Sequence, residues 1–262
     1  MTTLSPVSPI SPALLLPAGR LLAIASGKGG VGKTWFAITL AQALARRRER
    51  VLLFDGDLGL ANVDIQLGLT PEHDLGAVIS GRISLQEAVL RHAGGFSILA
   101  GHSGSGTLAQ IAPPQLERLL EGLRAQSTPF ERVVLDLGAG LDRSVRRMSA
   151  FADTLVVLVT EEPTSLTDAY ATLKLHTADA PDRQAVVVVN QASNHAAGER
   201  TYATLARACQ AFLGRTPPLL GVVRRDERVR EAIRRQGLFL QRHPTAPAAA
   251  DIEAIAEKLQ GA

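Results

Sequence analysis

The chain has 262 residues, of which 46% are hydrophobic and 20% charged, and its formal net charge is +3 with a pI near 9.4. This ordinary composition predicts one α/β domain that is long enough to bury a sizeable core. The single cysteine, Cys209, excludes a disulfide framework and any multi-cysteine metal site within the chain, which suits a reducing cytoplasm. Because its neighbours are apolar, we expect Cys209 to be a small buried helix residue rather than a nucleophile.

Residues 1–19 hold four prolines among serine and threonine, and we predict a disordered, Pro/Ser-rich leader there. The leader has no basic n-region, and its apolar run Leu14–Leu16 is too short for a signal core or a membrane span. A partner-binding peptide is the alternative. No other stretch approaches a membrane-spanning length, so we expect a cytoplasmic protein that meets a membrane only through a partner.

A glycine-rich stretch follows, from Ser26 to Thr34, with the sequence S-G-K-G-G-V-G-K-T. It lies between the apolar run Leu21–Ala25 and the helical pattern Ile38–Leu44. This order of strand, loop and helix fits the phosphate-loop pattern G-x-x-x-x-G-K-[ST]. A glycine-rich turn with incidental lysines is the alternative, which the length of the match disfavours.

Each residue type in this loop suits a bound triphosphate. Glycines let backbone N–H groups turn toward phosphate oxygens at the positive end of the helix. Lys33 neutralises the β- and γ-phosphates, and the Thr34 hydroxyl is placed to ligate Mg²⁺. The predicted nucleotide-binding residues of the loop are Gly27, Gly29, Gly30, Val31, Gly32, Lys33 and Thr34. A second lysine, Lys28, is a spare cation pointed at the phosphates.

The segment Lys28 to Thr34 resembles the K-G-G-x-G-K-[ST] loop of the deviant Walker-type ATPases, the MinD/ParA superfamily. In that family the first lysine reaches across an ATP-sandwich dimer to the nucleotide of the partner. The resemblance therefore implies a homodimer that forms with ATP, and it implies a catalytic role for Lys28 beside Lys33.

Strand-like apolar runs alternate with helical stretches along the rest of the chain, as in a mainly parallel sheet covered on both faces. The predicted strands are Leu21–Ala25, Val51–Asp55, Phe96–Ala100, Arg132–Asp136, Thr154–Val159, Ala185–Asn190 and Leu219–Val223. We predict an α/β fold with a doubly wound, mainly parallel sheet flanked by helices, in a single P-loop ATPase domain over residues 20–262. Ligands should collect outside the carboxyl ends of the strands.

Two strand ends carry carboxylates. Asp55 and Asp57 end the second run, and such a pair can face Mg²⁺ or its water shell and position the attacking water. Asp55 to Asp64 resembles switch I of MinD-type ATPases, which implies that Asp57 orients the hydrolytic water and that Asp55 supports the metal through water or Thr34. A polar turn-rich loop is the alternative.

Asp136 ends the run Arg132–Asp136, as a Walker B carboxylate should. It is placed to hold Mg²⁺ through water, because a metal at the phosphates needs a nearby anion on a rigid strand. The next residues resemble switch II, with Gly138 where the family often has proline.

We expect the ends of two later strands to lie beside the adenine base of the nucleotide. The Asn190 amide can donate and accept together, and it matches a strand-end asparagine that binds adenine in the family. The segment Gly221–Asp226 lies where the family often has G-x-[IV]-P-x-D, whose backbone packs along adenine. Here Arg224 replaces the proline, and we expect Arg225 to contact the nucleotide.

Three helices are predicted with further roles. One is expected in Thr160–Ala169 with Thr164 or Ser165 as its cap. This segment resembles part of the dimer face of the family, which implies partner contacts for Glu162, Ser165 and Asp168, although a simple capped helix explains it nearly as well. Ser84–Arg91 has capping-box spacing. Asp251–Gln260 has one apolar stripe and an acidic polar side, which favours a docked final helix over a basic membrane-targeting one.

One cysteine and two tyrosines argue against the cluster-carrying and tyrosine-kinase branches of the superfamily. Asp55 to Leu69 looks most like the FlhG/FleN flagellar-number regulators, and the resemblance covers roughly residues 20 to 260. It implies a slow, Mg²⁺-dependent switch ATPase that restrains a flagellar transcriptional regulator or an FlhF-like GTPase. An N-terminal D-Q-A-x-x-L motif is not evident, which favours the regulator.

Two other functions stay open. The first is a ParA-like DNA-partitioning ATPase, for which clustered arginines should form one face. These are Arg46, Arg47, Arg48, Arg143, Arg146, Arg147, Arg224, Arg225, Arg228, Arg230, Arg234 and Arg235. The small net charge favours solvated helix faces instead. The second is a non-hydrolysing binding module that uses nucleotide only to fix its shape, which Asp57 argues against.

Overall fold

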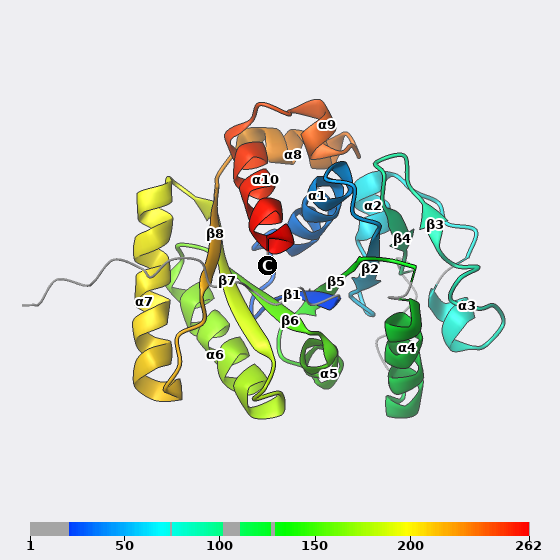
Figure 1. Ribbon diagram of the computed structural model, residues 1–262, viewed down its shortest axis with the longest axis horizontal. Coiled ribbons are helices and arrows are strands. Elements are labelled where there is room, and N and C mark those ends of the chain that lie inside the picture. Colours follow the sequence, from blue (N-terminus) through cyan, green and yellow to red (C-terminus); the bar gives the residue numbers. More distant parts are fainter. Residues whose placement is uncertain (1–20, 74, 102–110, 127–128, 262) are drawn as a thin grey trace, which may run out of the picture.

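The computed structural model describes residues 21–73, 75–101, 111–126 and 129–261 (Figure 1). The predicted leader, residues 1–19, lies outside this part. The strands are β1 Leu21–Ser26, β2 Val51–Gly56, β3 Leu90–Arg91, β4 Ser97–Leu99, β5 Arg132–Ala139, β6 Thr154–Val159, β7 Gln184–Ala192 and β8 Leu219–Arg224. The helices are α1 Lys33–Arg46, α2 Val63–Leu67, α3 Leu75–Ile79, α4 Pro113–Gln126, α5 Arg143–Phe151, α6 Pro163–Asp179, α7 His195–Leu213, α8 Glu227–Arg234, α9 Phe239–Arg242 and α10 Pro247–Gln260.

The strands form one sheet in the order β3-β4-β2-β5-β1-β6-β7-β8. Every neighbouring pair is parallel except β3 and β4, which are antiparallel. Parallel strands with helical crossovers confirm the predicted doubly wound α/β fold. The glycine-rich loop follows β1, which lies between β5 and β6, so the site sits near the middle of the sheet.

Helices cover both faces of the sheet (Figure 1). α1, α8, α9 and α10 lie on one face, and α4, α5, α6 and α7 lie on the other. β1, β2 and β6 are buried along their whole length, which explains why their sequences are continuous apolar runs. α1 is buried from Trp35 to Leu44 because α10 packs over it and shields it from solvent.

The helix predicted over Ser84–Arg91 is wrong. The capping-box bonds do form, since Ser84 N donates to Glu87 Oε2 at 2.7 Å and Glu87 N donates to Ser84 Oγ at 3.3 Å. However, residues 85–88 make only a turn, and Leu90 then pairs with Ile98 in the antiparallel β3–β4 ladder. Pairing with the next strand along the chain therefore overrides the local helix signal.

The final helix is docked, as predicted. Ile252, Ile255 and Leu259 of α10 are buried against β8 and α1. A Cβ at Gly221 of β8 would lie 2.5 Å from Ile255 Cγ1, so the helix and strand are in close contact. Cys209 is also buried as expected, and burial raises the pKa of its thiol to about 11. Within the described residues, no helix has the length and apolar character needed to cross a membrane.

Candidate nucleotide-binding site

The glycine-rich loop joins β1 directly to the N-terminus of α1. Gly32 is the N-cap residue of α1 and has φ +89°, a left-handed conformation that favours glycine. No side chain of the described residues caps this helix, so its first N–H groups stay available to an anion. The predicted phosphate-binding loop therefore has the backbone geometry that phosphate binding needs.

The end of β7 holds this loop in place. Asn190 is buried, and its Nδ2 donates to the Val31 carbonyl at 2.7 Å. Gln191 Nε2 donates to the Gly30 carbonyl at 3.2 Å. A Cβ at Gly32 would lie only 2.8 Å from Asn190 Nδ2, which is a second reason for glycine there. Asn190, expected at the base, thus supports the phosphate loop in this structure, and a contact with adenine stays a prediction.

Sequence reasoning did not identify Gln191. Its φ is +57°, which is uncommon for a residue other than glycine. Such strain marks functional segments, but it has no signature in the local sequence.

α6 packs against the start of the loop. A Cβ at Gly27 would lie 2.5 Å from the Asp168 carbonyl oxygen, so this glycine is required by the close approach of the helix. Ser165 is buried, and its Oγ accepts a hydrogen bond from Thr160 N at 3.0 Å. This bond ties the residue that follows β6 to the first turn of α6, and the partner contact that the resemblance implied for Ser165 stays a prediction.

Lys28 is engaged within its own chain. Its ammonium forms an ion pair with Glu162, the N-cap residue of α6, and donates to Thr164 Oγ1 at 3.1 Å. The hydrogen bond from Lys28 lowers the pKa of Glu162. The side chains are 40% and 64% exposed, so the pair is solvated and weak.

Lys33, Thr34 and Asp136 meet at the carboxyl edge of β5. Burial lowers the pKa of Lys33, while Asp136 and Asp57 act in the opposite direction. Burial also raises the pKa of Asp136 to about 7, although Thr34 donates a hydrogen bond to its carboxylate and Lys33 lies near. The other oxygen, Asp136 Oδ1, is buried and finds no hydrogen-bond partner among the described residues.

This set of oxygens fits a divalent cation. Mg²⁺ is bound in proteins by one or two carboxylates, by hydroxyls, and by waters and phosphates. The orphaned Asp136 Oδ1 beside the Thr34 hydroxyl matches that need, because a buried acceptor without a partner is costly until a ligand satisfies it.

Asp55 organises switch I. It is fully buried, and its two oxygens accept from three backbone N–H groups: Oδ1 from Asp57 at 3.2 Å, and Oδ2 from Asn62 and Val63, each at 3.0 Å. Burial and the neighbouring Asp136 raise the pKa of Asp55 to about 8, against these hydrogen bonds. Its main observed role is to shape the loop, and its support of a metal stays a prediction.

Asp57 lies in the segment that resembles switch I and close to the segment that resembles switch II. It is half-buried, and its Oδ1 accepts from Leu60 N at 2.9 Å. A Cβ at Gly138 would lie 3.3 Å from the same oxygen. Glycine in place of the family's proline therefore lets the carboxylate approach switch II closely.

Arg225, the other residue expected at the nucleotide, follows β8. Its N–H donates to the Ala192 carbonyl at 2.8 Å, which ties the end of β8 to the end of β7. Its side chain is exposed, and its charge contributes to the lowered pKa of Glu162, so it faces the same edge as Lys28.

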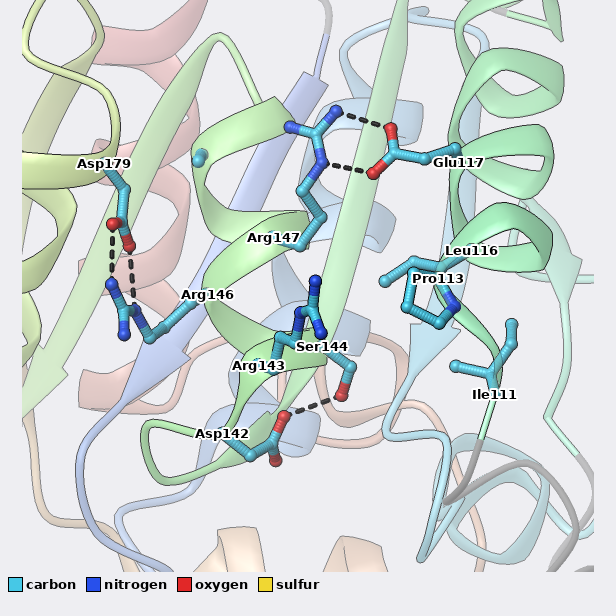
Figure 2. A pocket seen from close by; sticks show the side chains of 11 residues that line it. Ile111, Pro113, Leu116, Glu117, Asp142, Arg143, Ser144, Arg146, Arg147 and Asp179 are labelled. Atoms are coloured by element: carbon cyan, nitrogen blue, oxygen red, sulfur yellow. Dashed lines mark hydrogen bonds and ion pairs between the residues drawn. The ribbon is translucent and has the colours of Figure 1, made fainter.

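A separate groove of about 870 Å³ lies between α4 and α5 (Figure 2). Figure 2 shows Arg146 and Arg147 leaving α5 in different directions, each joined to a carboxylate. Arg146 binds Asp179 at 2.6 and 2.8 Å, and Arg147 binds Glu117 with both contacts at 2.5 Å. Two cations of the predicted arginine cluster are therefore neutralised within the chain.

The profile of the CobQ/CobB/MinD/ParA nucleotide binding domain matches residues 22–239. The chain belongs to this family. Antiactivator FleN of Pseudomonas aeruginosa is 37% identical over 240 residues, which are 92% of this chain and 86% of FleN. Flagellum site-determining protein YlxH of Helicobacter pylori is 29% identical over 192 residues, which are 73% of this chain and 64% of YlxH.

Solved MinD structures share the fold. The cell division ATPase MinD of Pyrococcus furiosus superposes with a TM-score of 0.78 at 24% identity, covering 92% of this chain and 98% of that one. MinD of Pyrococcus horikoshii, complexed with Mg-ADP, has a TM-score of 0.77 at 22% identity, covering 91% and 94%. The predicted membership of the MinD/ParA superfamily and the resemblance to FlhG/FleN are confirmed.

Proposed function

We propose that this protein is a slow, Mg²⁺-dependent MinD-like ATPase that dimerises with ATP and regulates flagellar number or flagellar gene expression through a partner. The observation that carries this proposal is the meeting of Lys33, Asp57 and Asp136 beside one glycine-rich loop, which also carries Lys28, at the carboxyl edge of the sheet. The Mg-ADP complex of a MinD with the same fold supports ATP and Mg²⁺ as the ligands.

The residues divide the chemistry between them. The loop N–H groups and Lys33 hold the phosphates and balance their charge. Thr34 and Asp136 supply the oxygens for Mg²⁺, which neutralises charge that develops on the phosphates when it is bound. Asp57 orients the attacking water and accepts its proton.

Lys28 links the two chains of the proposed dimer, because it completes the nucleotide site of the second copy. In the single chain it is held by Glu162 and Thr164. To complete the site of a second copy, it must leave these partners. Because the ion pair is exposed and weak, this exchange costs little, and ATP bridging two chains can drive it.

The partner is a flagellar transcriptional regulator or, as the second choice, an FlhF-like GTPase. FleN, which is an antiactivator, aligns with 92% of the chain, and this supports the regulator. YlxH, which determines a flagellum site, supports the same process.

DNA binding of the ParA type is not favoured, because many of the clustered arginines are paired. Besides Arg146 and Arg147, ion pairs engage Arg224 with Asp251, Arg228 with Asp226 and Arg235 with Glu231. ATP-dependent, salt-sensitive binding to a nonspecific duplex would revive this function. The non-hydrolysing module would be favoured if nucleotide stays unchanged after long incubation with Mg²⁺.

The proposal is tested by light scattering on the full chain with Mg²⁺ and either ADP or ATP. We expect the mass to double with ATP and not with ADP, and we expect Asp57→Ala to prolong the dimer and Lys28→Ala to abolish it. A mass that never responds to ATP would contradict the switch.

A further inference from the structure

One arginine fastens the end of β8 to the first turns of α10. Arg224 N and Nε both donate to Asp251 Oδ2 at 2.9 Å, and Arg224 Nη2 donates to Asp251 Oδ1 at 2.9 Å. Nη2 also donates to the Pro247 carbonyl at 3.1 Å. The Asp251 side chain is only 4% exposed, so this is a buried carboxylate satisfied by one residue in three places.

The neighbouring residues extend this clamp. Asp226 accepts a hydrogen bond from the backbone of Ala248 at the start of α10, which helps to lower the pKa of Asp226. His195 Nε2, at the start of α7, lies 3.1 Å from Asp251 Oδ1. The segment 224–226 is therefore fixed between α10, α7 and the end of β7, where Arg225 N donates to Ala192 O.

The clamp continues to the phosphate loop along β7. Ala192 receives the hydrogen bond from Arg225, and the two preceding residues, Asn190 and Gln191, hold the loop carbonyls of Val31 and Gly30. The loop is thus held by Asn190 and Gln191 themselves, and the clamp lies beside them at the same edge of the sheet.

The two sides of the loop have different chemistry. β5 and β2, on one side of β1, bring the carboxylates that suit a metal and the reacting phosphate. β6, β7 and β8, on the other side, bring amides, a guanidinium and backbone groups to the carboxyl edge, where ligands of such sheets lie. The carboxylates on this side are already engaged within the chain: Glu161 with Ser193, Glu162 with Lys28 and Asp251 with Arg224. This second side is the one left for the nucleoside.

We propose that Arg224 and Asp251 are positioning residues that hold segment 224–226 against the nucleoside of the bound nucleotide, so that α10 is part of the frame of the site. This inference rests on the proposed nucleotide binding. Docking of α10 does not need the clamp, because Ile252, Ile255 and Leu259 bury its apolar face and Lys258 Nζ donates to Leu220 O at 2.8 Å.

The test compares Asp251→Asn and Arg224→Lys with Lys258→Ala, which breaks an α10–β8 bond outside the clamp. Calorimetry on the full chain with Mg²⁺ measures affinity for ATP and for inorganic tripolyphosphate, which has no nucleoside. We expect both clamp variants to bind ATP about tenfold more weakly and tripolyphosphate as wild type does, because charge-assisted bonds are lost on the nucleoside side alone. Lys258→Ala should bind both ligands normally.

Several results would overturn the clamp: unchanged ATP affinity in both variants, an equal loss for ATP and tripolyphosphate, or a wild type that binds ATP no better than tripolyphosphate. Arg224→Lys keeps the charge beside Asp251, so it remains informative if Asp251→Asn does not fold. The molecular mass measured by light scattering with ATP distinguishes failure of the dimer switch from failure of the clamp. A wild type that binds ATP without doubling its mass contradicts the dimer switch alone, while unchanged affinities with a doubled mass contradict the clamp alone.

Discussion

The two sides of the phosphate loop differ in how completely their polar groups are satisfied. On the β7 and β8 side, Asn190 and Asp251 have partners at 2.7 to 3.1 Å. On the β2 and β5 side, Asp136 has a buried oxygen without a hydrogen-bond partner among the described residues, and burial raises the pKa of both Asp55 and Asp136. Asn190 and Asp251 thus have hydrogen-bond partners without a ligand, whereas Asp136 needs a cation to satisfy its second oxygen.

The β7 and β8 side therefore holds the loop in place, and the β2 and β5 side supplies the groups for metal binding and hydrolysis. Satisfied buried hydrogen bonds hold the loop in one shape, so little ordering is required when the phosphates bind. Buried carboxylates that repel each other destabilise the free protein, and the same charges stabilise a bound metal. Substitutions on the two sides should therefore change stability in opposite directions.

The largest effect is expected at Asp57, whose carboxylate lies close to Gly138. Asp57→Ala removes the group that positions water, so we expect hydrolysis to fall by about 10² to 10⁴-fold while ATP binding stays within a few-fold of wild type. Steady-state phosphate release and calorimetry measure the two quantities. Glu117→Gln, in the groove of Figure 2, is the matched control and should keep full activity. Normal hydrolysis by Asp57→Ala would remove this residue from the mechanism.

Asp136→Asn should raise the stability of the metal-free protein and lower its ATPase activity. Removing the charge relieves burial and repulsion from Asp55, so the metal-free protein should gain on the order of 1–2 kcal/mol at pH 8. Activity should fall by roughly 10 to 100-fold because a metal-supporting oxygen is lost. Chemical denaturation and phosphate release give both values. A variant that is less stable than wild type at pH 8 would show that the carboxylate is not strained.

The pH dependence sharpens the same comparison. The pKa values of Asp55 and Asp136 are about 8 and about 7 in the folded chain, against 3.8 as the ordinary value. The folded state therefore holds protons that the unfolded state has released, so this contribution is full below about pH 4 and is lost as pH rises through 7 and 8. Without Mg²⁺, we expect the stability advantage of Asp136→Asn over wild type to grow from pH 5 to pH 8.

His176 also makes stability depend on pH, because burial lowers its pKa and the fold is destabilised as pH falls. Wild type and Asp136→Asn share His176, so the difference between their stabilities reports the two carboxylates alone. Mg²⁺ should stabilise wild type more at pH 8 than at pH 6, because its ligands must be deprotonated. An advantage of Asp136→Asn that is constant between pH 5 and pH 8 would contradict the raised pKa values. Thermal denaturation over this range supplies the data.

The smallest effect is expected at Glu162, which is exposed. Glu162→Gln frees Lys28 from its ion pair, so the ATP-bound dimer should form at a concentration about two to five times lower. Analytical ultracentrifugation measures this shift, and Glu161→Gln is the neighbouring control. A weaker dimer in Glu162→Gln would mean that Glu162 itself contacts the second chain.

Much of the site could be predicted because its chemistry is local. The glycine-rich loop and Asp57 follow β1 and β2, Asp55 and Asp136 lie in the second half of β2 and β5, and the carboxyl ends of parallel strands share one edge of a sheet. The parallel strands were predictable because each is a continuous apolar run. The burial of Cys209 and the docking of α10 were predictable from the apolar residues on the same helix.

Features that depend on pairing outside a single helix or strand could not be predicted. β3 pairs with β4, the next strand along the chain, and this made the helix predicted over Ser84–Arg91 wrong although its capping bonds form. The bonds of Arg224 to Asp251 span 27 residues, and no spacing rule connects them. Gln191 reaches Gly30 from a left-handed backbone conformation that the sequence does not announce. These cases reflect tertiary structure acting on weak local preferences.

In the proposed dimer, Lys28 completes the site of the second chain. Mixing Lys28→Ala with Asp57→Ala and measuring phosphate release tests this role of Lys28. In a mixed dimer, the Lys28→Ala chain keeps its own Asp57 and receives Lys28 from the other chain. We predict that each variant alone is inactive and that an equal mixture recovers activity up to about a quarter of the wild-type rate. Each mixed dimer has one complete site, and random pairing, which is the upper limit, would make half of the dimers mixed. A mixture as inactive as its components, or a fully active Lys28→Ala, would contradict the account.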